Sequence, residues 1–150
     1  MNSSTNHKII LIDDDNLTNY INRTILKRCL PGVEIHEFSN SYKAINFLKV
    51  IARSEDVEFL IFLDINMPDL TGWEVLDAIE RGFPELNAKV VMLTSSIDRA
   101  DRKKAFNWER IISFVSKPLD QEKVSSILDE LAHAKAVDRQ EAKASERKEA

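Results

Sequence analysis

Four short apolar runs in the sequence each end in polar residues whose chemistry is complementary. The residues that follow the runs are Asp13–Asp14–Asp15, Asp64, Thr94–Ser95 and Ser116–Lys117–Pro118. If the runs are parallel strands that point the same way, several carboxylates, a hydroxyl and an ammonium meet at one edge of a sheet. These groups together indicate a magnesium-assisted acceptor of phosphoryl groups.

Three of the carboxylates, on Asp13, Asp14 and Asp64, are expected to crowd into one crevice. Two carboxylates about 4 Å apart repel by about 4 kcal/mol at an effective dielectric constant of about 20. A hard divalent cation relieves this repulsion, and Mg²⁺ typically binds one or two carboxylates and keeps several waters. The alternatives are an acid with a raised pKa, or aspartates that only cap helices, which stays open above all for Asp15.

The other groups at the strand ends suit the transfer of a phosphoryl group. A carboxylate beside a metal can act as a nucleophile and form an acyl phosphate. Lys117 offers a positive charge, Thr94 a hydroxyl and Ser95 a backbone N–H to the phosphoryl oxygens. A lysine at a strand end is more often a solvated surface residue, but its expected place beside the acids favours a role in the site.

The elements that position these groups follow from the spacing of apolar residues. Unbroken apolar runs predict buried strands at residues 8–12, 59–63, 89–93 and 111–115, and a more polar run predicts an edge strand at 33–38. Apolar residues recur at helical spacing between the strands. The first helix is expected to bury Leu17, Tyr20, Ile21, Ile25 and Cys29.

The alternation of strands and helices predicts an α/β fold, a doubly wound (βα)₅ domain with a five-stranded parallel sheet. The second strand lacks a polar ending, which fits the strand order 2-1-3-4-5 with that strand at an edge. The domain is expected to span residues 8–132, after a polar segment at 1–7. Residues 133–150 are rich in Ala, Glu, Lys and Arg, which predicts either a charged extension of the last helix or a frayed tail.

Composition narrows the class of protein. A chain of 150 residues with 43% hydrophobic and 31% charged residues fits one soluble globular domain. The net charge of −4 argues against a nucleic-acid partner. The single cysteine fits a reducing compartment. Neither a signal peptide nor an apolar run long enough for a bilayer is present, so a cytoplasmic protein without a membrane partner is expected.

Four segments of the chain resemble, in order and in separation, the receiver domain of two-component response regulators. This is the CheY-like family, which has a flavodoxin-like fold. The segments are LIDDD (11–15), FLDINMPDLTGWEVL (62–76), VVMLTSS (90–96) and FVSKPLD (114–120). The resemblance covers roughly residues 7–132.

The resemblance implies a role for each residue at the strand ends. Asp64 would be the phosphoacceptor, and the ligands of a Mg²⁺ ion would be Asp13, Asp14, Asp64 and the backbone carbonyl of Asn66. The groups that bind the phosphoryl group or switch with it would be Thr94, Ser95, Lys117 and Phe114, and the Lys117–Pro118 bond resembles the family's cis peptide bond. Asn66 and Ser96 would tune dephosphorylation, which is expected not to be exceptionally slow.

The chain also departs from the family pattern. Residues 107–110 (Asn-Trp-Glu-Arg) stand where many receivers carry a small pair, which predicts a reorganised surface after the fourth helix. Phe114 lacks the hydroxyl of the tyrosine that is often found at its position. Among the aromatic residues Trp73, Phe106 and Trp108, Trp73 is expected to be partly packed, and Trp108 is the better candidate for an exposed patch.

These features predict a single-domain response regulator, not an enzyme except in its own phosphorylation and dephosphorylation. Asp64 would take the phosphoryl group from a sensor histidine kinase or a histidine phosphotransfer protein. The signal would leave through the face of the fourth helix, fifth strand and fifth helix to a downstream protein that the sequence does not identify. Phosphorylation-dependent homodimerisation stays open.

Two other functions are weighed against this reading. A haloacid-dehalogenase-like phosphatase also uses a strand-end aspartate with magnesium, but it needs an acid two residues later to protonate the leaving group, where this chain has Asn66. An unphosphorylated receiver-like scaffold would not need the complete set of acids, hydroxyl and lysine.

Overall fold

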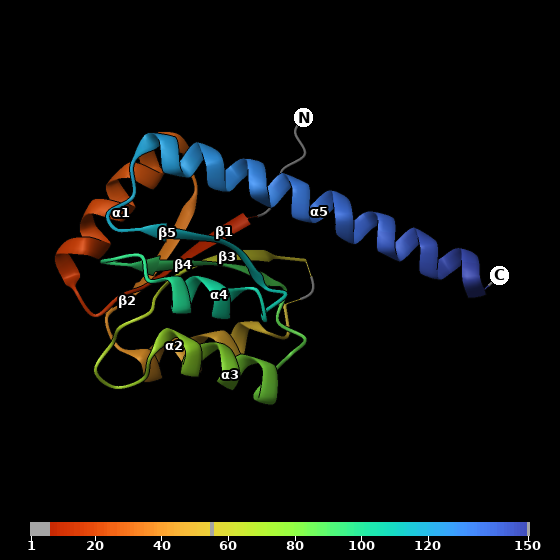
Figure 1. The fold of residues 1–150 in the computed structure, drawn as a ribbon, viewed down its shortest axis with the longest axis horizontal. Helices are drawn as coiled ribbons and strands as arrows, with labels where there is room; N and C mark the ends of the chain where they lie inside the picture. The colour runs from red at the N-terminus through yellow and green to blue at the C-terminus, as the bar shows by residue number, and fades with distance from the viewer. Residues whose placement is uncertain (1–6, 55, 150) are drawn as a thin grey trace.

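The computed structural model describes residues 7–54 and 56–149, and in this part of the chain five strands alternate with five helices. The strands are β1 (His7–Ile12), β2 (Glu34–Phe38), β3 (Glu58–Asp64), β4 (Ala88–Thr94) and β5 (Ile111–Ser116). The helices are α1 (Asn16–Cys29), α2 (Ser41–Ile51), α3 (Gly72–Gly82), α4 (Arg99–Ala105) and α5 (Gln121–Glu149). Figure 1 shows α1 and α5 on one side of the sheet and α2 and α3 on the other.

The strands form one parallel sheet in the order β2-β1-β3-β4-β5, which confirms the predicted fold class and strand order. The register brings the strand ends level: Ile12 pairs with Leu63, and Asp64 pairs with Leu93. β1 begins at His7, one residue before the predicted start of the strand, and residues 1–6 of the polar N-terminal segment lie outside the described residues.

Side chains from alternating strand positions build two cores, one on each face of the sheet. Ile10, Ile61 and Val90 point toward the face that α2 and α3 cover, whereas Ile9 and Leu60 point toward the face of α1 and α5. Each fully buried Ile or Leu side chain contributes about 1.5–3 kcal/mol. The sheet is therefore a rigid base, and its strand ends are fixed relative to one another.

Capping side chains fix the start of the helices next to the carboxyl ends of the strands. Thr71 and Glu74 form a capping box at α3, in which each side chain accepts a hydrogen bond from the other's backbone N–H. Asp98 caps α4 by accepting from Ala100 N. The carboxylate of Asp15 caps α1 and accepts from Leu17 N at 3.0 Å.

The burial of α1 contradicts the sequence prediction. Leu17 is 65% exposed and Tyr20 is 56% exposed, although both were expected in the core. The buried positions are instead Asn19, Asn22 and Leu26. The two asparagines can lie inside because each makes a hydrogen bond to the backbone of another segment.

The segment around α4 also differs from the prediction. Phe106 is 85% exposed, whereas Trp108 packs against the core on the α2 and α3 face. Of the three aromatic residues Trp73, Phe106 and Trp108, the exposed one is therefore Phe106, and Trp73 is buried. Arg110 holds the α4–β5 segment in place, because its guanidinium donates to the backbone oxygens of Pro84, Leu86 and Ala88.

α5 is a single helix of 29 residues, so residues 133–149 extend it rather than form a frayed tail. Its first half is held by Val124, Ile127 and Leu131 in the core. Farther along, Lys135 Nζ lies 2.6 Å from Glu58 Oε2, and the helix then runs past the edge of the sheet (Figure 1). Within the described residues, no helix combines the length and apolar character needed to cross a membrane.

Candidate functional site

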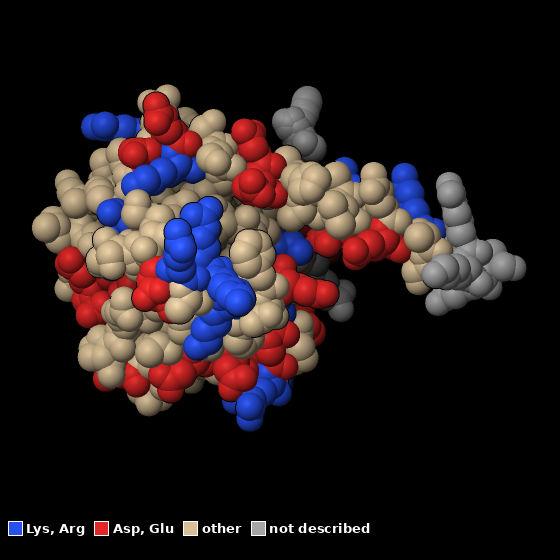
Figure 2. Space-filling model, in the orientation of Figure 1, with Lys and Arg blue, Asp and Glu red and all other residues tan. Residues whose placement is uncertain are grey.

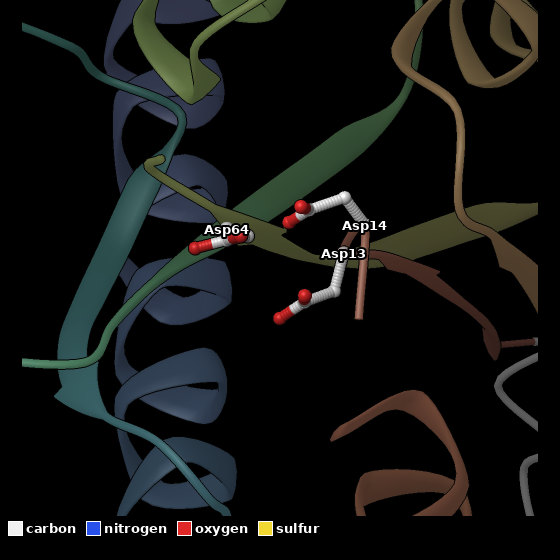
Figure 3. A group of neighbouring side chains, drawn as sticks. All are labelled: Asp13, Asp14 and Asp64. Carbon is white, nitrogen blue, oxygen red and sulfur yellow. The ribbon is translucent and has the colours of Figure 1, made fainter. Parts of the chain in front are cut away.

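Three carboxylates meet at the carboxyl ends of β1 and β3, as the strand order requires. Oxygen atoms of Asp13, Asp14 and Asp64 all lie within 4.8 Å of one another. Figure 3 shows Asp13 and Asp14 side by side after β1 and Asp64 facing them from the end of β3. Asp13 and Asp64 are buried, whereas Asp14 is exposed. The crevice therefore opens to solvent on the side of Asp14.

An ammonium group reaches into the same crevice from β5. Lys117 Nζ lies 2.9 Å from Asp13 Oδ2 and 3.2 Å from Asp64 Oδ1. Lys117 follows the last residue of β5, and its backbone N–H donates to Thr94 O at 2.8 Å. The peptide bond between Lys117 and Pro118 is cis. One lysine thus bridges the acids that follow β1 and end β3.

The pKa of Asp64 is raised to about 7. Burial is the largest cause, the negative charge of Asp13 adds to it, and Lys117 acts in the opposite direction. For Lys117, burial lowers the pKa, but Asp13 and Asp64 together outweigh burial and raise it. The three acids and one lysine leave an excess of negative charge in the crevice.

The donor set fits a hard divalent cation. All three acidic side chains offer oxygen atoms, which is what Mg²⁺ binds in proteins. Asp64 Oδ2 is buried, and within the described residues it has no hydrogen-bond partner. An unpaired carboxylate oxygen in a crevice with excess negative charge favours a bound cation. Asp15 does not join the cluster, because its carboxylate caps α1.

The hydroxyl predicted to switch lies at the end of β4. Thr94 is buried, and its Oγ1 donates to Ser96 O at 2.7 Å. Ser95 and Ser96 themselves are exposed. Phe114 lies on β5 opposite Met92 of β4 and packs, half-buried, against the core. Thr94 and Phe114 are thus placed on neighbouring strands, with Thr94 nearer the strand ends.

Asn66 lies two residues after Asp64, on the loop that leads to α3. Its backbone N–H donates to Asp64 Oδ1 at 3.3 Å, and its side chain is exposed. Gly72 brings this loop close to Asp64: a Cβ atom at Gly72 would lie 2.6 Å from the backbone oxygen of Asp64. The loop therefore packs directly against the end of β3.

Sequence reasoning missed three polar residues that hold the loops of the site. Asn19 donates to the backbone oxygen of Asp13 at 2.9 Å, and Asn22 accepts from the backbone N–H of Leu119 at 2.9 Å. Lys123 donates to two backbone oxygens of the β5–α5 loop. The spacing of Asn19, Asn22 and Leu26 matches one helix face, but an asparagine is normally assigned to the solvent side.

The fold agrees with comparisons to known proteins. The family model described as response regulator receiver domain matches residues 9–129. The chain belongs to this family, whose members act in two-component signalling. Its fold is the CheY-like, flavodoxin-like arrangement.

Two curated relatives carry the same domain within longer proteins. The hybrid signal transduction histidine kinase L of Dictyostelium discoideum is 30% identical over 124 residues, which are 81% of this chain and 7% of that protein. An uncharacterised response regulatory protein of Staphylococcus epidermidis is also 30% identical over 124 residues, 81% of this chain and 45% of that protein. The chain therefore spans less than half the length of either relative.

Solved structures show the same fold. A two-component response regulator from Cytophaga hutchinsonii is 30% identical, with a TM-score of 0.78 over 85% of this chain and 97% of that chain. A CheY-like receiver domain protein from Methanospirillum hungatei is 20% identical, with a TM-score of 0.67 over 87% of this chain and 97% of that chain, and it supports the fold alone.

Proposed function

We propose that the protein accepts a phosphoryl group on Asp64 in a reaction that needs Mg²⁺. The observation that carries the proposal is the cluster of three carboxylates within 4.8 Å of one another, bridged by the ammonium of Lys117. The donor would be a histidine kinase or a histidine phosphotransfer protein, which the similarity to a hybrid histidine kinase supports. The protein would catalyse only its own phosphorylation and dephosphorylation.

In the proposed step, a carboxylate oxygen of Asp64 attacks the phosphorus atom of a phosphohistidine. An O–P bond forms while the P–N bond breaks, and the electron pair leaves with the imidazole, which is protonated by solvent. Lys117 Nζ, now 3.2 Å from Asp64 Oδ1, needs only a small shift to bind a phosphoryl oxygen. Its positive charge would stabilise the charge that develops on the transferred group.

The cation would be held by Asp13, Asp14, Asp64 and the backbone carbonyl of Asn66. When bound, Mg²⁺ supplies positive charge that favours ionised Asp64 and offsets the charge of the phosphoryl oxygens. Because the pKa of Asp64 is raised to about 7 without it, part of the acceptor is protonated at neutral pH and cannot attack. This is the physical reason to expect a metal requirement.

The signal would leave through the face formed by α4, β5 and α5. A phosphoryl oxygen on Asp64 would compete with Ser96 O for the hydroxyl of Thr94. If Thr94 moves toward the phosphoryl group, the space that its side chain leaves would let Phe114 repack. The population shift is limited by the difference in contacts between the two states. Figure 2 shows basic side chains gathered over α4, where Arg99, Arg102, Lys103 and Lys104 are exposed. A downstream protein or a second phosphorylated copy would bind here.

The proposal is tested with acetyl phosphate and Mg²⁺ as the only reagents. We expect one hydroxylamine-labile phosphate per chain, located on Asp64 by peptide mass spectrometry. Asp64→Asn should abolish the label, and removal of Mg²⁺ by a chelator should reduce it to background. The matched control is Asp69→Asn on the exposed loop after β3, which should label normally.

The same samples separate the alternative functions. Turnover of a generic phosphomonoester would indicate a phosphatase, and a folded chain without label would indicate an unphosphorylated scaffold. Either result would overturn the proposal.

The lifetime of the phosphoryl group is a further part of the proposal. Asn66 and Ser96 have small, exposed side chains beside the acceptor, so water can approach the phosphorus atom. We expect self-dephosphorylation that is not exceptionally slow. A half-life of many hours after removal of the donor would contradict this.

A further inference from the structure

The loop that carries Lys117 joins an edge strand to α5, and its hydrogen bond to the sheet runs from the backbone N–H of Lys117 to Thr94 O at 2.8 Å. The last residue pair of β4 and β5 is Thr94 with Ser116, and every residue of β5 is only half-buried. A lysine side chain has several rotatable bonds, so its ammonium is placed only if its backbone is held. The structure holds this backbone with two side chains from different helices.

Lys123, on the first turn of α5, binds the loop from one side. Its ammonium donates to Ser116 O and to Pro118 O, both at 3.0 Å. These are the carbonyls immediately before and after Lys117. The nearest carboxylate, on Asp120, lies 4.0 Å away, so the ammonium is turned toward the loop. Hydrogen bonds from a charged donor are about twice as strong as neutral ones.

Asn22, on the inner face of α1, binds the loop from the other side. Its Oδ1 accepts from the backbone N–H of Leu119 at 2.9 Å, across 97 residues of sequence. The Nδ2 atom of Asn22 is buried and has no hydrogen-bond partner within the described residues. A half-satisfied buried amide costs about 1–3 kcal/mol. A residue that served packing alone would not need an amide at this position.

We propose that Asn22 and Lys123 are positioning residues for Lys117. They fix the Ser116–Leu119 backbone so that the ammonium of Lys117 meets the acids that follow β1 and end β3. This inference rests on the proposed phosphorylation of Asp64, and it predicts that both residues act on phosphoryl transfer only through Lys117.

The test is a double-mutant cycle on the rate of Asp64 labelling by acetyl phosphate at saturating Mg²⁺. Lys123→Met removes the donor and keeps the length of the side chain, and we expect labelling to slow by about threefold to tenfold. Lys123→Arg keeps the charged donor and should restore most of the rate. In a Lys117→Met background, Lys123→Met should cause no further loss. Lys49→Met, an exposed lysine on α2, is the matched control.

Asn22→Ala should behave as Lys123→Met does, and Asn46→Ala on the exposed side of α2 is its control. If Asn22→Ala does not fold, the Lys123 cycle still decides the matter, because Lys123 is partly exposed. Two further readouts separate positioning from a general loss of structure. The affinity for Mg²⁺ without donor should stay unchanged, and the affinity for beryllofluoride, a phosphoryl analogue, should fall in parallel with the rate.

The outcomes distinguish this inference from the proposed function. If the unmodified protein takes no label, the proposed function fails and the inference fails with it. If Lys117→Met slows labelling but Lys123→Met and Asn22→Ala do not, only the inference is overturned. The inference is also overturned if Lys123→Met slows labelling by the same factor with and without Lys117→Met, because Lys123 would then act independently of Lys117.

Discussion

At both ends of the sheet a lysine contacts a carboxylate, but the two ends differ in burial and in the number of acids. At the carboxyl end, Lys117 contacts two buried acids, Asp13 and Asp64. At the amino end, Lys135 contacts the half-buried Glu58, and His7 completes the group. The ion-pair distances are similar at both ends.

The difference lies in burial and in the balance of charge. In the site, three acids face one lysine, and burial raises the pKa of Asp64 to about 7. At the amino end, one acid faces one lysine, and burial together with Lys135 lowers the pKa of His7, although Glu58 acts in the opposite direction. The two ends therefore differ in the charge that is left over. In the site, the surplus of buried negative charge leaves a carboxylate that favours a bound cation.

The largest expected effect comes from removing each lysine in turn. Lys117→Met should slow labelling of Asp64 by about a hundredfold, since it removes a charged donor from the transferred group. Lys135→Met removes the equivalent charge at the amino end and should leave the rate unchanged. Initial rates with acetyl phosphate check both. Equal slowing in the two variants would break the comparison between the two ends.

The next effect concerns Gly72, which packs against the end of β3. A Cβ atom there would lie 2.6 Å from Asp64 O and 3.1 Å from Ile65 Cα, both on the backbone. We expect Gly72→Ala to lower the free energy of unfolding by about 1–3 kcal/mol and to slow labelling. At Gly82 a Cβ atom meets nothing within 4 Å, so Gly82→Ala should be neutral or slightly stabilising. Urea unfolding measures both, and equal losses would contradict the close contact.

A smaller effect is the pH dependence of stability without Mg²⁺. Between its ordinary pKa of 3.8 and about 7, Asp64 holds a proton in the folded protein that the unfolded chain has released. Stability therefore falls as pH rises through this range, and the penalty is complete above it. Asp64→Asn removes the penalty, so it should raise the free energy of unfolding by about 1–3 kcal/mol near pH 8, and by less near pH 5.

The matching change at the amino end should have the opposite sign. Glu58→Gln removes the ion-pair partner of Lys135 and should lower stability slightly wherever Glu58 is ionised. Urea titrations at several pH values would show the two trends. A gain from Glu58→Gln as large as that from Asp64→Asn would mean that the two ends do not differ in charge balance.

The smallest effect is expected at the second ion pair of α5. Lys89 Nζ lies 3.0 Å from Asp138 Oδ2, and both side chains are partly exposed. Asp138→Asn should change the free energy of unfolding by less than about 1 kcal/mol, and added salt should reduce the difference further. If thermal unfolding shows a larger loss of stability that added salt does not reduce, the ion pair at the amino end contributes as much as the buried ion pairs of the site, and the comparison fails.

The strand ends were predictable because sequence order and parallel pairing alone bring them together. A buried parallel strand is read from an unbroken apolar run, and its carboxyl end lies at the same sheet edge as the others. The sequence therefore predicted the positions of the polar residues at the strand ends, which are Asp13, Asp64, Thr94 and Lys117.

The supports of the site were not predictable in the same way. Asn22 faces inward and accepts a hydrogen bond from the backbone N–H of Leu119, and no local sequence pattern predicts a bond between segments so far apart in the chain. The same holds for Arg110, whose carbonyl partners lie on the α3–β4 segment. Trp108 was the candidate for an exposed patch but packs against the core, whereas Phe106, for which the sequence left both environments open, is exposed.

The length of α5 has a geometrical consequence. The helix is held in the core as far as Leu131, contacts Lys89 of β4 through Asp138, and continues to Glu149. At about 1.5 Å per residue, the part beyond Asp138 is an arm of about 17 Å. A tilt of about 5° at its base would carry the far end about 1.4 Å. The loop at the start of this helix carries Lys117, so a small angular change beside the acids is enlarged into a displacement at the other end of the molecule.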